Sequence, residues 1–369
     1  MDVWRVACSG PSDLSGVQAL VDAGRIVPAD IVAVMGKTEG NGCVNDHTRE
    51  FATMAWSQFL GERLGCAPGE VHHRVALVMS GGTEGVLSPH FTVFTRRPLR
   101  DAGTGIEKRL VLGIAHTADF APEDIGRTAQ VEATARAVRA AMRDAGIDDL
   151  ADVHFVQVKC PLLTAAKVNE ASGRGVPTVT RDSYESMGYS RGASALGVAV
   201  ALGEMTLDTA TAAPVLSDFS LFSARASVSA GIELANNVVI VLGEAAGSAS
   251  PYRIAHTVMR DAVDGASVRR MLREAFGLDA DQDHALVASR LVNLFAKAES
   301  SPDGLVRGQR HTMLDDSDIN ATRHARAAVG GVLASVAGHT ALYVSGGAEH
   351  QGPAGGGPVA AIVRIGSAQ

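Results

Sequence analysis

Three residue types that could act together in catalysis recur in one order along the chain: a lysine, an arginine and a serine. Each lysine ends an apolar run, each arginine follows a Thr or Ser beside an Ala-rich segment, and each serine opens a Ser-Gly-Gly or Ser-Ala-Gly turn. A single lysine or turn of this kind would be ordinary. Three sets in one order indicate a shared geometry, and they are Lys37, Arg49 and Ser80; Lys159, Arg191 and Ser229; and Lys297, Arg323 and Ser345.

These residue types suit acyl transfer, most simply the hydrolysis of an amide. A serine at a strand end followed by glycines exposes its hydroxyl and leaves backbone N–H groups free to bind an oxyanion. A lysine held in an apolar strand near a guanidinium should have a lowered pKa, so it could accept the serine proton near neutral pH. Arginine offers a planar fork to carbonyl oxygens. Three such sets around one axis would suit a ligand that presents the same group three times.

Other catalytic motifs are excluded by their spacing. Gly36-Lys37-Thr38 looks like the end of a P-loop, but the first glycine of that motif would fall on Ile31. No G-x-S-x-G surrounds the three serines, and no S-x-x-K ends on the three lysines. H-E-x-x-H is absent and no G-x-G-x-x-G follows a strand-like run, which disfavours a zinc peptidase and a dinucleotide-binding domain.

Repeated strand-then-helix patterns would position the three sets. The tetrapeptide IAHT occurs at residues 114–117 and 254–257, each copy leads into a helix-like pattern, and WRVAC near the N-terminus begins a more divergent copy. The runs ending on Lys37 and Lys159 are rich in Val and Ile and predict strands, whereas the run ending on Lys297 could be a strand or a helix end. The Ala-rich helices that follow are expected to begin at the N-caps Thr48, Ser190 and Thr322.

The chain of 369 residues is long for a single hydrophobic core, and the repeats divide it into three. We expect seams at residues 99–108 and in the small-residue stretch 243–251. The predicted fold class is α/β, with repeat units at 1–104, 110–247 and 253–369.

Composition favours a soluble globular protein, with 46% hydrophobic residues, 20% charged residues and a formal net charge of −7. The acidic balance argues against a nucleic-acid partner, and no apolar run is long enough to predict a membrane span. The N-terminus lacks a signal-peptide pattern, so cytoplasm is the expected location. The cysteines form no C-x-x-C pair and are expected to be free thiols: Cys8, Cys43, Cys66 and Cys160.

Six blocks of the sequence resemble the ring-opening amidohydrolases, the family of cyanuric acid hydrolases and barbiturases. They are MGKTEGNGCVNDHTRE, VMSGGTEGVLSPH, HFVQVKCPLL, YESMGYSRGASALG, FAKAESSPDGLVRGQRHTMLDDSDINATRHARA and VSGGAEHQGPAGGGP, and they look closest to the cyanuric acid hydrolase branch. The resemblance runs nearly end to end. It implies three concatenated, structurally similar α/β units with pseudo-threefold symmetry around a central β-barrel-like core, with helices outside. It also implies a homotetramer and an active site on the pseudo-threefold axis, which would match a substrate with three imide units.

The resemblance also implies a reaction and a set of roles. The reaction is hydrolytic opening of cyanuric acid to carboxybiuret, which decarboxylates to biuret; the alternative is a barbiturase acting on barbituric acid. The family's catalytic pair is that of the middle unit, which makes Ser229 the nucleophile and Lys159 the base, without a catalytic cofactor. The sequence itself shows only that Ala230 replaces a glycine there, and Ser227 is the nearest competitor. The implied substrate-binding residues are Lys37, Arg49, Ser80, Gly81, Arg191, Ser229, Ala230, Lys297, Arg323, Ser345 and Gly346.

The loop after Ser345 could bind a hard cation. Its glycines and proline can aim several carbonyl oxygens at one point, which Mg²⁺ or Ca²⁺ would accept together with one carboxylate. By resemblance the ligands of this structural metal are the Glu299 side chain and the backbone of Ala348, Gln351, Gly352, Pro353 and Gly356. A metal-free surface loop is the alternative.

A different class of function also fits the repeated set. A non-catalytic protein could bind planar heterocycles with the same arginines and serines, and it would show ligand-dependent stabilisation without a product. The three lysines argue against it, because binding a near-neutral ring does not need an uncharged amine.

Overall fold

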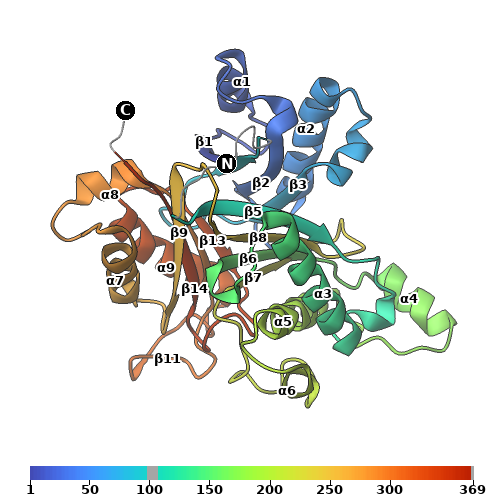
Figure 1. Cartoon of the computed structure of the whole chain (residues 1–369). Coiled ribbons are helices and arrows are strands. Elements are labelled where there is room, and N and C mark those ends of the chain that lie inside the picture. The colour runs from blue at the N-terminus through green and yellow to red at the C-terminus, as the bar shows by residue number, and fades with distance from the viewer. Residues whose placement is uncertain (98–106, 367–369) are drawn as a thin grey trace.

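The structure is a computed structural model that describes residues 1–97 and 107–366. Its main strands form three four-stranded sheets, each drawn from one stretch of the chain (Figure 1). The first contains β1 (Asp2–Ala7), β2 (Ile31–Thr38), β3 (Ala76–Gly81) and β4 (His90–Thr95). The second contains β5 (Arg109–His116), β6 (Val153–Cys160), β7 (Ala226–Ala230) and β8 (Val238–Ala245). The third contains β9 (Tyr252–Met259), β10 (Leu291–Ala298), β13 (Tyr343–Gly346) and β14 (Gly357–Arg364).

The three sheets have the same strand order. It is β1-β4-β2-β3 in the first sheet, β5-β8-β6-β7 in the second and β9-β14-β10-β13 in the third. In each, the lysine-bearing strand lies in the middle, pairs in parallel with the short serine-bearing strand and pairs antiparallel with the last strand. The uncertain run before Lys297 is therefore a strand, β10, and all three lysine-bearing runs share one environment.

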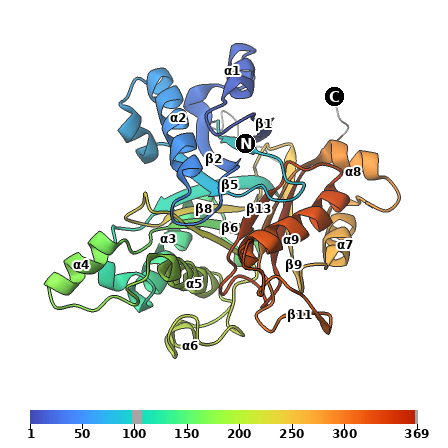
Figure 2. The same ribbon diagram turned by 180° about the vertical axis from the view of Figure 1, so that it is seen from behind.

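Helices lie on the outside of each sheet (Figures 1 and 2). Those of the first stretch are α1 (Ser15–Asp22) and α2 (His47–Leu64). Those of the second are α3 (Thr128–Ala145), α4 (Ala165–Gly173), α5 (Ser183–Ala201) and α6 (Leu207–Thr211). Those of the third are α7 (Gly265–Phe276), α8 (His284–Arg290) and α9 (Ala321–Ala337). Short 3₁₀ helices occupy Pro28–Asp30, Pro68–His73, Pro122–Asp124 and Leu150–Asp152, and a small hairpin joins β11 (Leu305–Val306) to β12 (Gln309–Arg310).

Both faces of each sheet are buried, because side chains alternate between two apolar cores. In β2, Val34 packs outward with α2, whereas Ala33 and Met35 point to a core shared by all three sheets. Phe155 of the second sheet and Phe295 of the third belong to the same shared core, with ring centroids 5.6 Å apart. The sheets therefore meet through their inner faces, and the helices cover their outer faces.

The predicted central barrel is wrong for the part of the chain that the structure describes: its strands form open sheets, each with two edges. The inner faces meet by side-chain packing and not by a continuous hydrogen-bonded ladder. The predicted seam at residues 99–108 lies largely outside the described residues. Within these residues, no helix is long and apolar enough to cross a membrane.

The helix caps differ from those expected. Asp46, Asp182 and Asn320 cap α2, α5 and α9, and each side chain accepts a hydrogen bond from a backbone N–H of the first turn. These Asx residues lie upstream of the expected Thr and Ser positions, and Ser190 lies well inside α5. Asp and Asn are acceptors as strong as Ser or Thr at this position, so residue type alone did not identify the cap.

Candidate active site

The three lysines lie beside the three serines in register. Lys37 pairs with Ser80 across β2 and β3, Lys159 with Ser229 across β6 and β7, and Lys297 with Ser345 across β10 and β13. Because parallel neighbours in register point to the same side of a sheet, each ammonium group reaches the end of its serine-bearing strand. The repeated order of lysine and serine in the sequence thus corresponds to one repeated position in the fold.

Hydrogen bonding distinguishes the middle pair from the other two. Lys37 Nζ and Lys297 Nζ each donate to their own serine Oγ at 3.3 Å. Among the described residues Lys159 Nζ has no hydrogen bond to Ser229; it donates to the carbonyls of Met79 at 3.0 Å and Ala230 at 3.4 Å. Ser229 Oγ lies 3.3 Å from Ser345 Oγ.

Contacts between sheets bring the three serine-bearing strands together. Lys159 donates to the residue before Ser80, and Lys297 Nζ donates to the carbonyl of Val228, the residue before Ser229, at 2.8 Å. Each of these two lysines therefore touches its own strand pair and the serine-bearing strand of another sheet. The strand ends converge on one point as a result.

All three lysines are buried, and burial lowers their pKa values. Desolvation is the main cause in each case: it lowers the pKa of Lys159 to about 8 and that of Lys297 to about 7, and it sets the pKa of Lys37 well below the usual value. Glu233 partly opposes this effect at Lys159. A buried amine with a pKa near neutrality can be uncharged and accept a proton, as a general base requires.

A small cavity lies where the strand ends converge. All six predicted residues of the serine turns line it, together with two of the predicted arginines and residues from neighbouring loops. The lining consists of Gly42, Arg49, Ser80, Gly81, Met187, Arg191, Ser229, Ala230, Arg326, Ser345 and Gly346. Lys37, Lys159 and Lys297 lie next to these residues and are almost fully buried.

The third arginine of the cavity is Arg326 and not the expected Arg323. The side chain of Arg323 is 40% exposed, whereas that of Arg326 is only 3% exposed and lines the cavity. The two lie three residues apart on α9, so they share one side of the helix at different heights. The pattern of Thr or Ser followed by Arg predicted Arg323. A dipeptide does not show which side chains of the helix face the cavity, so it could not identify Arg326.

A set of acidic residues was missed by the sequence analysis. A glutamate follows each serine by four residues: Glu84 in SGGTE, Glu233 in SAGIE and Glu349 in SGGAE. Glu84 accepts from Arg326 at 2.6 and 2.7 Å, and Glu349 accepts from Arg191 at 2.5 and 2.7 Å. Glu233 Oε1 instead lies 3.6 Å from Lys159 Nζ. The repeated S-x-x-x-E spacing was the signal that could have found them.

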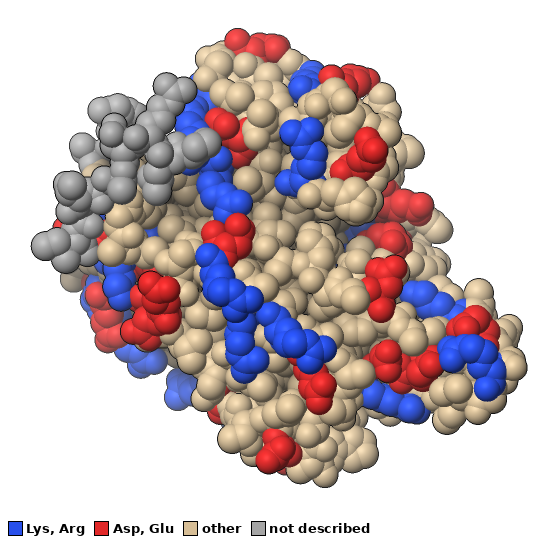
Figure 3. All heavy atoms as spheres, turned by 45° about the vertical axis from the view of Figure 1, so that its right-hand side comes forward, with Lys and Arg blue, Asp and Glu red and all other residues tan. Residues whose placement is uncertain are grey.

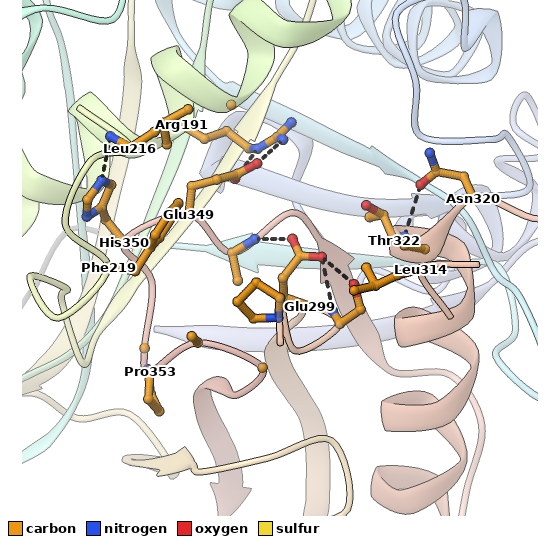
Figure 4. A pocket seen from close by; sticks show the side chains of 18 of the residues that line it. Arg191, Leu216, Phe219, Glu299, Leu314, Asn320, Thr322, Glu349, His350 and Pro353 are labelled. Carbon is orange, nitrogen blue, oxygen red and sulfur yellow. Dashed lines mark hydrogen bonds and ion pairs between the residues drawn. The ribbon is translucent and has the colours of Figure 1, made fainter. Parts of the chain in front are cut away.

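The loop after Ser345 borders a second cavity of about 420 Å³, on which Arg191 also lies (Figure 4). Its lining includes four of the predicted metal-binding residues: Glu299, Ala348, Gly352 and Pro353. Gln351 and Gly356 lie outside that lining. The side chain of Gln351 is committed elsewhere, because it accepts from Val228 N at 2.6 Å and donates to the carbonyls of Gly347 and Glu349.

The chemistry around Glu299 fits a hard cation. Its carboxylate accepts from the backbone N–H groups of Ser300 and Ala348 at 3.0 Å, and burial first, then the nearby charge of Glu349, raises its pKa. A cation would relieve both effects. In the described residues no three or more His, Cys, Asp or Glu side chains group into a metal site, so backbone carbonyls would have to complete the coordination.

Comparison with known proteins shows the family to which the chain belongs. The family of amidohydrolase ring-opening proteins matches residues 2–364, and the chain belongs to it. A cyanuric acid amidohydrolase of Pseudomonas sp. (strain ADP) is 61% identical over 364 residues, which cover 99% of both chains. A cyanuric acid amidohydrolase of Bradyrhizobium diazoefficiens is 60% identical and covers 98% of both.

Solved structures agree with this assignment. A cyanuric acid hydrolase, described as an evolutionary innovation by structural concatenation, superimposes with a TM-score of 0.94 at 61% identity over 98% of both chains. The cyanuric acid hydrolase of A. caulinodans superimposes with a TM-score of 0.90 at 52% identity over 99% of both chains. The protein is therefore an amidohydrolase with the α/β fold of these relatives.

Proposed function

We propose that the protein opens the ring of cyanuric acid by hydrolysis, giving carboxybiuret, which loses carbon dioxide to become biuret. The observation that carries the proposal is the convergence of three in-register Lys–Ser pairs on one cavity that three arginines line. Cyanuric acid presents the same imide unit three times, so each set has a counterpart on the ring. The full-length identity to cyanuric acid amidohydrolases supports the same substrate.

Ser229 is the proposed nucleophile and Lys159 the proposed base. Uncharged Lys159 takes the proton of Ser229 Oγ, which attacks a ring carbonyl, and backbone N–H groups at the serine turns stabilise the oxyanion. As the carbonyl carbon–nitrogen bond breaks, Lys159 returns the proton to the leaving nitrogen. Water then hydrolyses the acyl-serine, releasing carboxybiuret and restoring the hydroxyl. Ser229 must turn from Ser345 toward Lys159, and catalytic hydrogen bonds often tighten only when substrate binds.

The other two pairs hold the substrate in this proposal. Ser80 with Lys37 and Ser345 with Lys297 would donate to the remaining carbonyls, and Arg49, Arg191 and Arg326 would orient the ring. Arg49 is suited to this role because its Nε is buried and has no hydrogen-bond partner in the part of the chain that the structure describes. A ligand carbonyl could supply that partner.

We also propose that the chain consists of three concatenated units, 1–104, 110–247 and 253–369, related by a pseudo-threefold axis through the cavity. The identical strand orders and the in-register Lys–Ser pairs support this organisation. A structural Mg²⁺ or Ca²⁺ held by Glu299 and the backbone of Ala348, Gln351, Gly352, Pro353 and Gly356 would fix the loop behind Ser345 and take no part in proton transfer. We further propose that the protein is a cytoplasmic homotetramer and that its partner is a small cyclic imide substrate.

The test is a side-by-side incubation of the purified protein with cyanuric acid and with barbituric acid. We expect biuret from cyanuric acid and much slower opening of barbituric acid, because a CH₂ replaces one ring N–H there and removes one hydrogen-bonding position. Faster turnover of barbituric acid would make the protein a barbiturase. Stabilisation by cyanuric acid without any biuret would leave only a binding protein.

A further inference from the structure

The glutamates that follow the three serines by four residues do not all do the same thing. In the first and third sheets they hold an arginine of the cavity: Glu84 accepts from Arg326 through both oxygens, and Glu349 accepts from Arg191 in the same manner. Paired ion contacts of this kind fix the guanidinium plane. These two glutamates therefore position arginines that would bind the substrate.

The middle glutamate breaks the pattern. By position, Glu233 would hold Arg49, but Arg49 donates instead to the carbonyls of Ala230 at 3.1 Å and Cys43 at 2.7 Å. The Glu233 carboxylate lies against Lys159, with Oε1 3.6 Å from Nζ. Burial is the largest single influence on the pKa of Glu233 and raises it, but the charges of Lys159 and Arg49 and hydrogen bonds together outweigh burial. The pKa of Glu233 is therefore lowered overall, and the group is a carboxylate at neutral pH.

The backbone after the serine explains the difference. The glycine two residues after the serine has a positive φ in the first and third sheets, 101° at Gly82 and 76° at Gly347, whereas Gly231 does not have one. A Cβ on Gly82 or Gly347 would collide with Arg326 or Arg191, at 2.5 and 2.7 Å. A Cβ on Gly231 would collide with the Glu233 carboxylate at 2.4 Å. An arginine side chain therefore packs against the glycine in the turns after Ser80 and Ser345, whereas the Glu233 carboxylate takes that position in the turn after Ser229.

We propose that Glu233 is a positioning residue for Lys159 and that this contact distinguishes the reacting Lys–Ser pair from the two pairs that hold the substrate. The inference rests on the proposed roles of Ser229 and Lys159. When Ser229 Oγ gives its proton to Lys159 Nζ, Glu233 stays ionised and stabilises the ammonium group that forms. Glu233 neither takes this proton nor touches the substrate; it acts through Lys159, as the aspartate of a catalytic triad acts through its histidine.

The charged and titratable groups that face Lys159 come from three elements. Glu233 lies in the loop after β7, Arg49 and Asp46 lie at the start of α2, and Cys160 follows on β6. Burial is the largest influence on the pKa of Lys159 and lowers it, Glu233 raises it most, and Arg49 lowers it further. Removing the Glu233 charge would therefore lower the proton affinity of Lys159.

The experiment compares the pH dependence of turnover in Glu233→Gln with that in the wild-type enzyme. We expect kcat to fall by about 10- to 100-fold, because the ammonium loses its counter-charge in the transition state. We also expect the acidic limb of the profile to move to lower pH by about one unit. Ionisation of cyanuric acid is common to all variants, so the difference between profiles belongs to the enzyme. Glu233→Asp, which keeps the charge, should recover part of kcat and the original limb.

Glu84→Gln is the matched control, because Glu84 occupies the same position in its turn but contacts an arginine. We expect it to raise KM and leave the acidic limb in place. An unchanged limb in Glu233→Gln, with kcat within about threefold of wild type, would overturn the inference. If Ser229→Ala retains turnover, the proposed roles of Ser229 and Lys159 are wrong, and the inference about Glu233 fails with them. If Ser229→Ala is inactive and Glu233→Gln behaves as wild type, only this inference fails.

Discussion

At the scale of single residues, the burial of three lysines is the feature on which the proposed chemistry depends. Their apolar strands and the expected nearby guanidinium groups predicted a lowered lysine pKa from the sequence, and the structure agrees in direction for all three. The sequence could not show that, among the described residues, Lys159 is the one of the three lysines that forms an ion pair with a glutamate, since that contact depends on how the chain turns at Gly231. Nor could it show that Arg326 lines the cavity in place of Arg323, because Arg326 follows an alanine and lies outside the Thr-Arg or Ser-Arg pattern.

The first prediction concerns pH. Lys159 has a pKa of about 8, so it is protonated and unable to accept the Ser229 proton at lower pH. We expect the rate at saturating substrate to fall about tenfold for each pH unit below that value and to level off above it. Single-turnover measurements that follow biuret formation check this. A rate that is constant from about pH 6 to about pH 9 would contradict Lys159 as the base.

The second prediction separates the two arginines of α9. Arg326→Ala removes a buried guanidinium from the cavity, and we expect kcat/KM to fall by about 10- to 100-fold. Arg323→Ala removes a half-exposed side chain from outside the cavity, and we expect a change of about threefold or less. Steady-state kinetics on both variants decides between the positions, and a larger loss in Arg323→Ala would restore the sequence-based assignment.

At the scale of elements, the register of the strands explains how distant residues become a site. Val- and Ile-rich runs predicted the strands. The repeated order of lysine, arginine and serine predicted that these strands would occupy equivalent positions in the three parts of the chain. The pairing of each lysine strand with its serine strand arises from the parallel crossover through α2, α5 or α9, which the sequence implied only by its strand-then-helix order. The open edges of the sheets were not foreseen, because packing between sheets and closure into a barrel leave similar apolar patterns.

A third prediction concerns the link between the third sheet's loop and the second sheet's serine strand. Gln351 is fully buried, and its Oε1 accepts from Val228 N at 2.6 Å, next to Ser229. Gln351→Leu leaves that N–H without its partner, which costs about 1–3 kcal/mol of stability, and it should lower both the melting temperature and kcat. Thermal unfolding and kinetics measure the two effects. Gln58→Leu, on the exposed side of α2, is the control and should change neither; equal behaviour of the two variants would show that the link is unimportant.

At the scale of the whole molecule, the three stretches of chain, each a sheet with its helices, lie around a common centre (Figures 1 and 2). Residues from all three stretches line the small cavity at the strand ends. Basic and acidic side chains lie close together over the face shown in Figure 3, in keeping with a modest net charge of −7. The division into three strand-and-helix stretches could be predicted from the two IAHT copies and the divergent WRVAC copy near the N-terminus. The shared core of inner faces could not, since it depends on contacts between residues more than a hundred positions apart.

The fourth prediction tests the structural cation. If Mg²⁺ or Ca²⁺ is held at Glu299, removing divalent cations with a chelator should lower the melting temperature, and adding Mg²⁺ or Ca²⁺ back should restore it. Glu299→Gln should abolish the response to both treatments, because it removes the carboxylate. Differential scanning fluorimetry provides the readout without relying on activity. A wild-type melting temperature that ignores both chelator and cation would contradict a metal in this loop.

The central claim is that Ser229 opens the ring of cyanuric acid, and its most direct test is biuret formation by Ser229→Ala beside Ser227→Ala. Ser227 lies on the same strand two residues earlier, and its hydroxyl donates to Gln157 at 2.9 Å. We predict that Ser229→Ala loses turnover by about a thousandfold or more while keeping its melting temperature, and that Ser227→Ala keeps most of its activity. Biuret formation at a near-wild-type rate by Ser229→Ala would contradict the account.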